Sequence, residues 1–276
     1  MKNWIIKHDK LVQRLLEILP GFFSWNLILF PYWGILVIPN AVAYFVLFFN
    51  IFWFYQSFQI AVGAIISHLK IQASLNYDWL ADLKSFPDWK KINHVIIIPT
   101  FKEPLRILER TISAIAGQDL PRKQLSVILA MEEKEPENER KAKSEELTAK
   151  YGKIFANFIV TTHKLVPGEA VGKASNERFA AIWFKENVID KQSLAKSEFG
   201  KSKLDYFVVT SCDADHKFNP KHFSYLTFKF LDNPNRFRRF WQPAVMFYNN
   251  IWEIPAISRV PNTFASIWDI AQLPRR

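Results

Sequence analysis

Hydrophobic and polar residues follow two different patterns along this chain of 276 residues. No Asp, Glu, Lys or Arg occurs from Ile18 to Ser67, a run much longer than a buried helix of a soluble protein requires. From His94 onward, short apolar runs alternate with segments whose apolar residues recur at helical spacing. The pattern therefore predicts a membrane segment followed by an α/β domain.

The charge-free run predicts a hairpin of two membrane-spanning helices within residues 22–70. One span needs about 20 apolar residues, so a run of this length fits two spans, which we expect over residues 22–38 and 41–66. Pro39 and Asn40 supply the break between them. A cleaved signal peptide is the alternative, but the run lacks a small-residue cleavage site and continues far past a normal apolar signal region.

The flanks of this run predict the orientation in the membrane. Residues 1–21 carry apolar residues at helical spacing together with Lys7, Lys10 and Arg14, which predicts an amphipathic helix at the lipid surface that ends at Pro20 and Gly21. Basic residues lie on both sides of the run, so both ends are expected in the cytoplasm. The sequence thus predicts a multi-pass protein of the plasma (inner) membrane with a cytoplasmic soluble domain and membrane lipid as a partner.

Composition narrows the classes of partner. The net charge of +10 is compatible with nucleic acid, with anionic lipid or with an anionic substrate. No nucleic-acid-binding motif is present, so nucleic acid is not expected. The single cysteine, Cys212, has no second cysteine for an internal disulfide, which agrees with a reducing compartment.

Residues 92–276, after a linker over residues 71–91, are expected to form the soluble domain. The sequence predicts strands over residues 94–100, 124–131, 155–163 and 204–212, with helices over residues 105–117, 137–153 and 173–187 between them. Helices of this length between strands imply parallel pairing with right-handed crossovers. The fold class is therefore α/β with a mainly parallel, Rossmann-like sheet.

Polar residues follow the end of each predicted strand, and open α/β sheets bind ligands at that edge. Lys173 lies near a helix start, a position suited to phosphate oxygens. Asp213 and Asp215, one residue apart, can converge on a hard cation, although such aspartates also cap turns. The other candidates are Thr100, Phe101 and Glu103 in PTFKEP after the first strand, and Glu132 and Glu133 after the second.

These segments resemble, in the same order, the membrane-anchored family 2 glycosyltransferases, which include the bacterial cellulose and hyaluronan synthases and have the GT-A fold. PTFKEP resembles the family's Pro-Thr-Tyr-Asn-Glu-Pro turn beside the uracil, GKASN its Lys-Ala-Gly-Asn segment, and residues 213–216 its metal-binding Asp-Ala-Asp-His. FLDNPN and RRFWQPAVMFYNN are similar to the acidic-Asn-Pro helix end and the Val-Gln-Thr-Pro strand that follow. The resemblance covers most of residues 92–252, and four segments in order are more specific than an isolated Asp-x-Asp.

The resemblance implies a metal-dependent, inverting hexosyltransferase that moves a sugar from a nucleotide diphosphate, with a UDP-sugar expected, to an acceptor hydroxyl in polysaccharide biosynthesis. Asp215, with Asp213 nearby on the nucleotide, would hold Mg²⁺ or Mn²⁺, and Lys173 would lie beside the diphosphate. Thr100 and Glu103, with Phe101 in the same turn, would hold the base and ribose. His216 either contacts the metal ligands and helps to position them, or is only a turn residue.

The sequence departs from the family pattern in two places. Met131, Glu132 and Glu133 stand where the family has Asp-Asp-Gly, so which glutamate, if either, meets the nucleoside stays open. The family's acceptor-side Thr-Glu-Asp base and Gln-x-x-Arg-Trp motif would lie beyond Arg276, so we expect a chain truncated to the donor-binding part of the domain. The catalytic base is unknown, and Glu253 and Asp269 are the candidates for it.

Other functions are compatible with parts of this pattern. A phosphatase of the haloacid dehalogenase type needs Ser or Thr four residues after its first Asp, where this chain has Lys217. A nucleotidyltransferase usually has a Gly-rich loop near its first strand, which PTFKEP does not provide. The remaining alternative is a catalytically incomplete fragment that binds nucleotide sugar, or a subunit that a partner chain completes.

Overall fold

The computed structural model describes residues 8–170, 172–192, 206–248 and 251–273. The chain separates into two compact units, one over Gln72–Pro243 and one that combines Met1–Ile71 with Ala244–Arg276. The sequence predicts the soluble domain over residues 92–276. The unit that contains the sheet starts earlier, at Gln72, and also ends earlier, at Pro243.

Two long helices precede the sheet, α2 (Asp9–Val37) and α3 (Pro39–Asn76). Both are long and apolar enough to cross a membrane, and neither is buried among the described residues as the core helix of a soluble protein would be. The break before Pro39 agrees with the predicted turn.

The predicted helix end at Pro20 and Gly21 is wrong, because α2 continues through Pro20 and Pro31. A proline removes one backbone donor, which apolar membrane helices tolerate. Residues 1–7 of the predicted amphipathic helix lie outside the described residues.

Glycine allows α2 and α3 to meet beside their turn. A Cβ atom on Gly34 would lie 2.7 Å from the Phe30 ring and 2.8 Å from the Val42 side chain. The rings of Phe30 and Phe45 pack edge to face there, with centroids 5.2 Å apart. A larger residue at position 34 would force the side chains of Phe30 and Val42 to move, and small residues commonly allow such close contacts between apolar helices.

The predicted linker over residues 71–91 is largely helical. It contains the end of α3, the short helix α4 (Trp79–Leu83) and the 3₁₀ turn η1 (Trp89–Lys91). The Lys221 ammonium group donates to the carbonyl oxygens of Leu75 and Tyr77, at 2.9 and 2.8 Å. The last carbonyls of a helix have no partner within the helix, so this lysine stabilises the end of α3.

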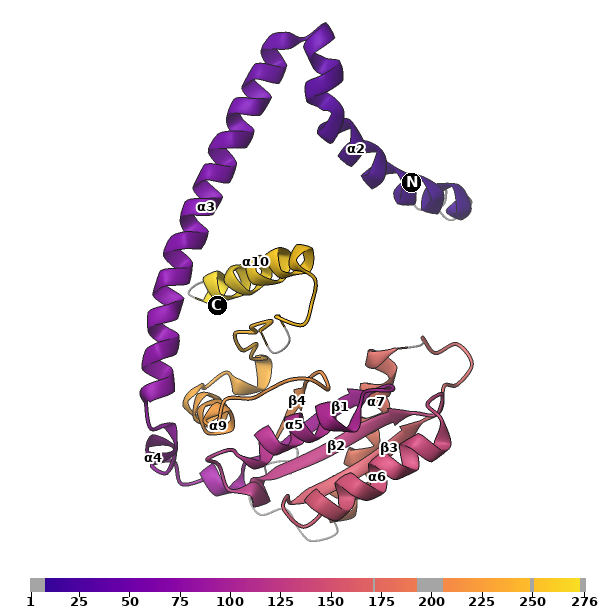
Figure 1. Ribbon diagram of the computed structural model, residues 1–276, viewed down its shortest axis with the longest axis vertical. Helices are drawn as coiled ribbons and strands as arrows, with labels where there is room; N and C mark the ends of the chain where they lie inside the picture. Colours follow the sequence, from indigo (N-terminus) through magenta and orange to yellow (C-terminus); the bar gives the residue numbers. More distant parts are fainter. Residues whose placement is uncertain (1–7, 171, 193–205, 249–250, 274–276) are drawn as a thin grey trace. The chain divides into compact units, whose positions relative to one another are not determined.

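The sheet consists of β1 (Asn93–Thr100), β2 (Leu125–Glu132), β3 (Asn157–His163) and β4 (Phe207–Ser211). Among the described residues all pairs are parallel and the order is β3-β2-β1-β4 (Figure 1). The connecting helices are α5 (Leu105–Ala116), α6 (Glu137–Tyr151) and α7 (Lys173–Phe184). The predicted strands, helices and parallel pairing are therefore confirmed.

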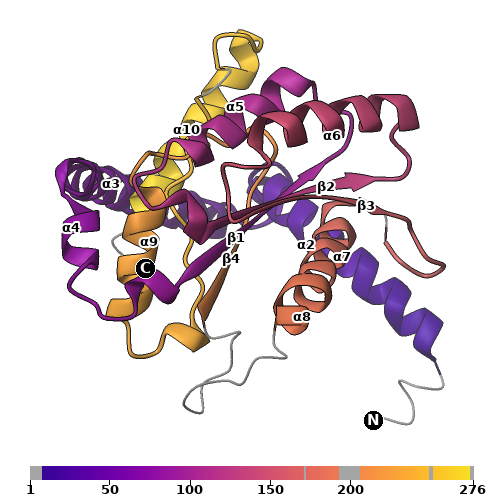
Figure 2. The ribbon, with the colours of Figure 1, turned by 90° about the horizontal axis from the view of Figure 1, so that it is seen from below.

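Helices cover the sheet on both faces. Figure 2 shows α5 and α6 on one face and α7 on the other. Ile96 and Ile98 of β1 pack with residues of α5 and α6, whereas Val95 and Ile97 pack with residues of α7. Alternate residues of a strand point to opposite faces, so the middle of a strand that is buried on both faces is apolar on both, as residues 95–99 of β1 are.

The strand order creates a switch point between β1 and β4. The chain passes from β1 to β2 and β3 in one direction and then returns to place β4 on the other side of β1. Open α/β sheets bind ligands at the carboxyl ends of the strands, where the strand order reverses. The PTFKEP turn follows β1 and the aspartate pair follows β4, so the two segments flank this position.

The segments after β4 include helix α9 (His222–Asp232), the 3₁₀ turn η5 (Arg236–Arg238) and helix α10 (Ala256–Gln272). The strand expected in RRFWQPAVMFYNN is wrong, since residues 239–248 contain no strand. Pro243 has no backbone N–H to donate to a neighbouring strand, which disfavours pairing there. Residues 249 and 250 lie outside the described residues.

Candidate functional site at the carboxyl edge of the sheet

The backbone of the aspartate motif is held from α5. The hydroxyl of Thr111 donates to the Ala214 carbonyl at 2.6 Å, and both residues are buried. The Arg110 guanidinium donates to the Asp215 carbonyl at 3.4 Å. Asp213 and Asp215 are exposed on either side of buried Ala214. The carboxylates therefore project into solvent from a backbone whose position is set by buried contacts.

Asp213, Asp215 and His216 form a group that could hold a metal ion. One ligand atom from each residue lies within 4.8 Å of the others. The backbone N–H of Asp213 donates to His216 Nδ1 at 3.2 Å, so this ring nitrogen is already engaged as an acceptor. The two carboxylates are then the better metal ligands, and hard oxygen ligands suit Mg²⁺ or Mn²⁺. The residues present fit such an ion, with His216 supporting the turn.

Lys173 reaches the same group from the start of α7. Its Nζ lies 2.6 Å from Asp213 Oδ1. Gly172 precedes the helix with φ +142°, a conformation that favours glycine. The Asn176 side chain donates to the Ala130 carbonyl at 2.8 Å and so attaches the first turn of α7 to β2. The glycine and asparagine of GKASN thus position the lysine at the sheet edge.

Mutual stabilisation shifts the pKa values of this ion pair. The hydrogen bond from Lys173 lowers the pKa of Asp213 below its usual value, although partial burial opposes the shift. Burial alone would lower the pKa of Lys173, but its hydrogen bond to Asp213 and the charges of Asp213 and Glu177 outweigh it, so the pKa is raised. Both groups are therefore charged near neutral pH.

Glu103 closes the turn that follows β1. The Thr100 hydroxyl donates to Glu103 Oε2 at 2.5 Å, and the backbone N–H of Phe101 donates to the same oxygen. Lys102 between them has φ +65°, in the left-handed region. Thr100 is buried, whereas the Phe101 ring is 43% exposed beside the switch point. In the structure, Thr100 and Glu103 hold the turn, and Phe101 presents an apolar surface at its tip.

Glu132 and Glu133 lie farther along the sheet edge, because β1 separates β2 from β4. The Glu133 N–H donates to the His163 carbonyl at 2.9 Å, and its carboxylate lies 3.7 Å from Lys164. Arg140 of α6, which the sequence analysis missed, donates to the carbonyls of Glu133 and Glu135 at 2.9 and 2.8 Å. The strand order does not bring these glutamates beside the aspartate pair.

Glu177 and Ser211 are further residues that the sequence analysis missed. The Ser211 hydroxyl donates to Glu177 Oε1 at 2.7 Å, and Lys173 Nζ lies 3.4 Å from the same oxygen. The available signal was the spacing of four residues between Lys173 and Glu177, which places both side chains on one face of a helix. Ser211 ends β4, so its contact could not be read from local spacing.

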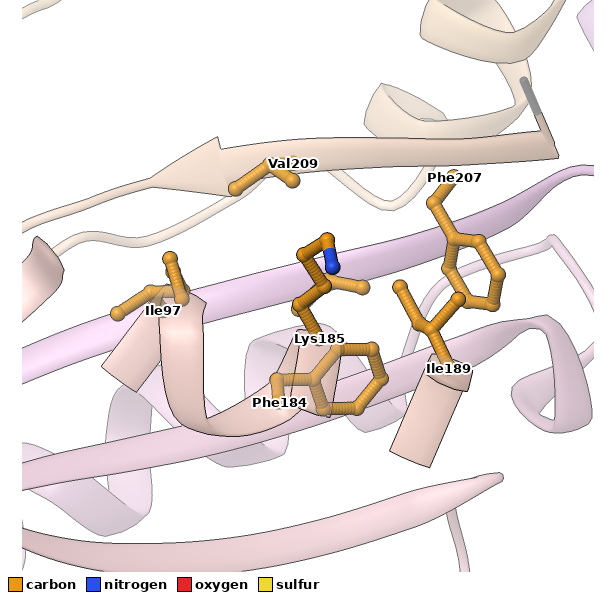
Figure 3. Close-up of a pocket in the computed structure, with 8 residues that line it drawn as sticks. Ile97, Phe184, Lys185, Ile189, Phe207 and Val209 are labelled. Carbon is orange, nitrogen blue, oxygen red and sulfur yellow. The ribbon is translucent and has the colours of Figure 1, made fainter. Parts of the chain in front are cut away.

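An apolar cavity of about 220 Å³ lies between the sheet and the segment of α7 and η3 (Lys185–Ile189), as Figure 3 shows. Its lining includes Ile97, Phe184, Phe207 and Val209. Lys185 contributes a charged group, and its Nζ lies 2.8 Å from Asp190. This lining does not offer the several polar groups that a diphosphate requires, so we place the candidate site at the strand ends.

The two candidates for an acceptor base belong to the other compact unit. Asp269 of α10 accepts a hydrogen bond from the Val245 N–H at 3.1 Å, and Glu253 is exposed. Their role as a base stays a prediction.

No protein-family model matches this chain, and no curated protein matches it either. The function must therefore be inferred from the residues at the sheet edge.

Proposed function

We propose that this chain is a membrane-anchored, metal-dependent glycosyltransferase of the family 2 type, which takes a sugar from a nucleotide diphosphate sugar. The observation that carries the proposal is the group formed by Lys173, Asp213 and Asp215 at the switch point between β1 and β4. A cationic group beside two carboxylates that fit a divalent ion provides both parts of a diphosphate site. The membrane anchor in this proposal consists of α2 and α3, which are long and apolar enough to cross a membrane.

Each residue has a role in this proposal. Asp213 and Asp215 would hold Mg²⁺ or Mn²⁺, which as a Lewis acid stabilises the charge that develops on the leaving diphosphate. Lys173 and the amino end of α7 would attract the diphosphate oxygens. The exposed Phe101 ring offers a surface on which a nucleobase can stack. The turn closed by Thr100 and Glu103 would keep this ring in position.

Transfer also requires a base for the acceptor hydroxyl, for which Glu253 and Asp269 are the candidates. A chain that binds the nucleotide sugar without transferring it, or that needs a partner chain, is the alternative. The alternative keeps the same donor site and differs in its activity, so donor binding and sugar transfer should be measured separately.

The test uses the full chain purified in detergent, with calorimetric titration of UDP and other nucleoside diphosphates in the presence and absence of Mn²⁺. We expect binding that requires the metal. Radiolabelled sugar transfer from a panel of nucleotide sugars to membrane extract should then identify the donor. Metal-dependent binding without sugar transfer would favour the binding-only alternative. A nucleotide affinity that is the same with and without Mn²⁺ would contradict the proposal.

The proposed topology has an independent test in intact cells. In Asn40→Cys the new thiol should react with a membrane-impermeant maleimide, whereas in Lys150→Cys it should react only after permeabilisation. Native Cys212 gives little background, because it is buried and burial raises the pKa of its thiol to about 12. Labelling of position 150 in sealed cells would overturn the cytoplasmic orientation of the sheet.

A further inference from the structure

Lys173 lies between two carboxylates at the sheet edge. Its Nζ is 2.6 Å from Asp213 Oδ1 and 3.4 Å from Glu177 Oε1. The Ser211 hydroxyl, 2.7 Å from the same oxygen of Glu177, helps to fix that carboxylate. The Glu177 side chain is 23% exposed and that of Asp213 is 59% exposed, so Glu177 is the more sheltered of the two acceptors.

A divalent ion and the Lys173 ammonium group compete for Asp213. The lysine contacts one oxygen of a carboxylate that the metal would need. Two cations on one carboxylate repel each other strongly at such short distances. Metal binding is therefore expected to displace Nζ from Asp213, and Glu177 is an acceptor already within reach on the same helix face.

We infer that Lys173 is an exchangeable internal cation, which neutralises Asp213 before the metal binds and moves to Glu177 when the metal arrives. Glu177 is then a positioning residue that keeps the ammonium group at the sheet edge, where diphosphate oxygens would meet it. This inference rests on the metal site of the proposed function. It gives Glu177 and Ser211 a role in the site, whereas a metal site formed by the two aspartates alone would need neither residue.

An ordinary surface ion pair would behave differently. Lys185 of the segment after α7 pairs with Asp190 at 2.8 Å, with both side chains about half exposed. Removing such an exposed ion pair usually has little effect on the stability of the protein. Lys173, by contrast, connects Asp213 in the loop after β4 with Glu177 on α7, so its loss should change the metal affinity of the site. Lys185→Met is therefore a matched control for Lys173→Met.

The test is a double-mutant cycle on the purified full chain, with Mn²⁺ alone as the probe and free Mn²⁺ measured by electron paramagnetic resonance. Lys173→Met should bind Mn²⁺ about fivefold more tightly, because Asp213 no longer carries an ammonium group. Glu177→Gln should bind it roughly threefold more weakly, because Lys173 has lost its second acceptor. In the Lys173→Met background, Glu177→Gln should have no further effect, and the control Lys185→Met should match the wild type. Melting temperatures would verify that all variants are folded.

A second readout adds UDP to the same proteins. Lys173→Met should lose UDP affinity in the presence of Mn²⁺ although it binds Mn²⁺ more tightly, since it has no ammonium group at this position to bind the diphosphate. If the effects of Glu177→Gln are equal in the two backgrounds, Glu177 acts only through its own charge and the inference is overturned, whatever the result for sugar transfer. If the wild type binds no Mn²⁺, both the inference and the proposed metal site are overturned.

Discussion

Asp215→Ala should reduce the affinity for UDP in the presence of Mn²⁺ by on the order of a hundredfold or more, since even residues that only support metal ligands typically contribute tenfold to a hundredfold. The backbone of Asp215 is held by Arg110, and the neighbouring Ala214 carbonyl is held by Thr111, so the loop should keep its course. Because the Asp215 side chain is exposed, the free energy of unfolding should change by less than about 0.5 kcal/mol. Calorimetry with and without Mn²⁺ measures the first effect, and urea denaturation measures the second.

Asp232→Ala is the matched control for this substitution. Asp232 is also exposed and lies at the end of α9 in the same compact unit, so its removal makes the same change in net charge. It should leave UDP binding unchanged. If Asp215→Ala binds UDP as the wild type does, with no dependence on Mn²⁺ in either protein, the two aspartates only cap the turn after β4.

Acidification should destabilise the sheet unit through two histidines, starting at about pH 6.5. His94 of β1 is buried, with Nε2 2.7 Å from the Thr227 hydroxyl and its ring centroid 5.1 Å from that of Phe223. Burial lowers the pKa of His94 to about 3. Burial, with a smaller effect from His216, lowers the pKa of His222 to about 4. Both side chains are therefore neutral in the folded protein at pH values where an unfolded histidine is charged.

The sign of the effect follows from proton uptake. Below the usual histidine pKa of 6.5, the unfolded chain binds protons that the folded chain does not, so the free energy of unfolding decreases as the pH falls. The decrease approaches about 1.4 kcal/mol per pH unit for each histidine and ends near the folded pKa values. Above the unfolded pKa these two groups contribute no pH dependence.

Urea denaturation of the full chain in detergent, between about pH 7 and pH 5, measures this effect while most carboxylates stay ionised. His94→Gln retains a polar side chain near Thr227 and cannot take up a proton, so its stability should fall less steeply with acid. Equal slopes for the wild type and His94→Gln would contradict the assignment of the acid sensitivity to His94.

Local patterns in the sequence determined most elements of the fold. The charge-free run predicted α2 and α3, and the short apolar runs predicted β1 to β4, because strands of a parallel sheet that helices cover are rich in apolar residues. Pro39 marked the turn between the long helices correctly. Pro20 did not mark a helix end, since a proline within an apolar helix removes only one hydrogen bond and the surrounding turns can continue.

Only the tertiary structure decided how the strand ends are arranged. The sequence placed candidate residues at the ends of three strands and at the start of α7, but strand order depends on pairing between distant segments, such as that of Ile97 with Ile128 and Ser211. This order brings the aspartate pair beside the PTFKEP turn and leaves Glu132 and Glu133 one strand away.

The contact between Lys173 and Asp213, 40 residues apart, forms because α7 begins at the edge of the sheet where β4 ends. The link from Lys173 to Glu177 was visible as helical spacing, whereas the link from Glu177 to Ser211 required the return of the chain to β1. Residue types and periodicity are local properties that a sequence displays directly. The contacts that group them into a site are long-range, and the packing of the whole sheet determines them.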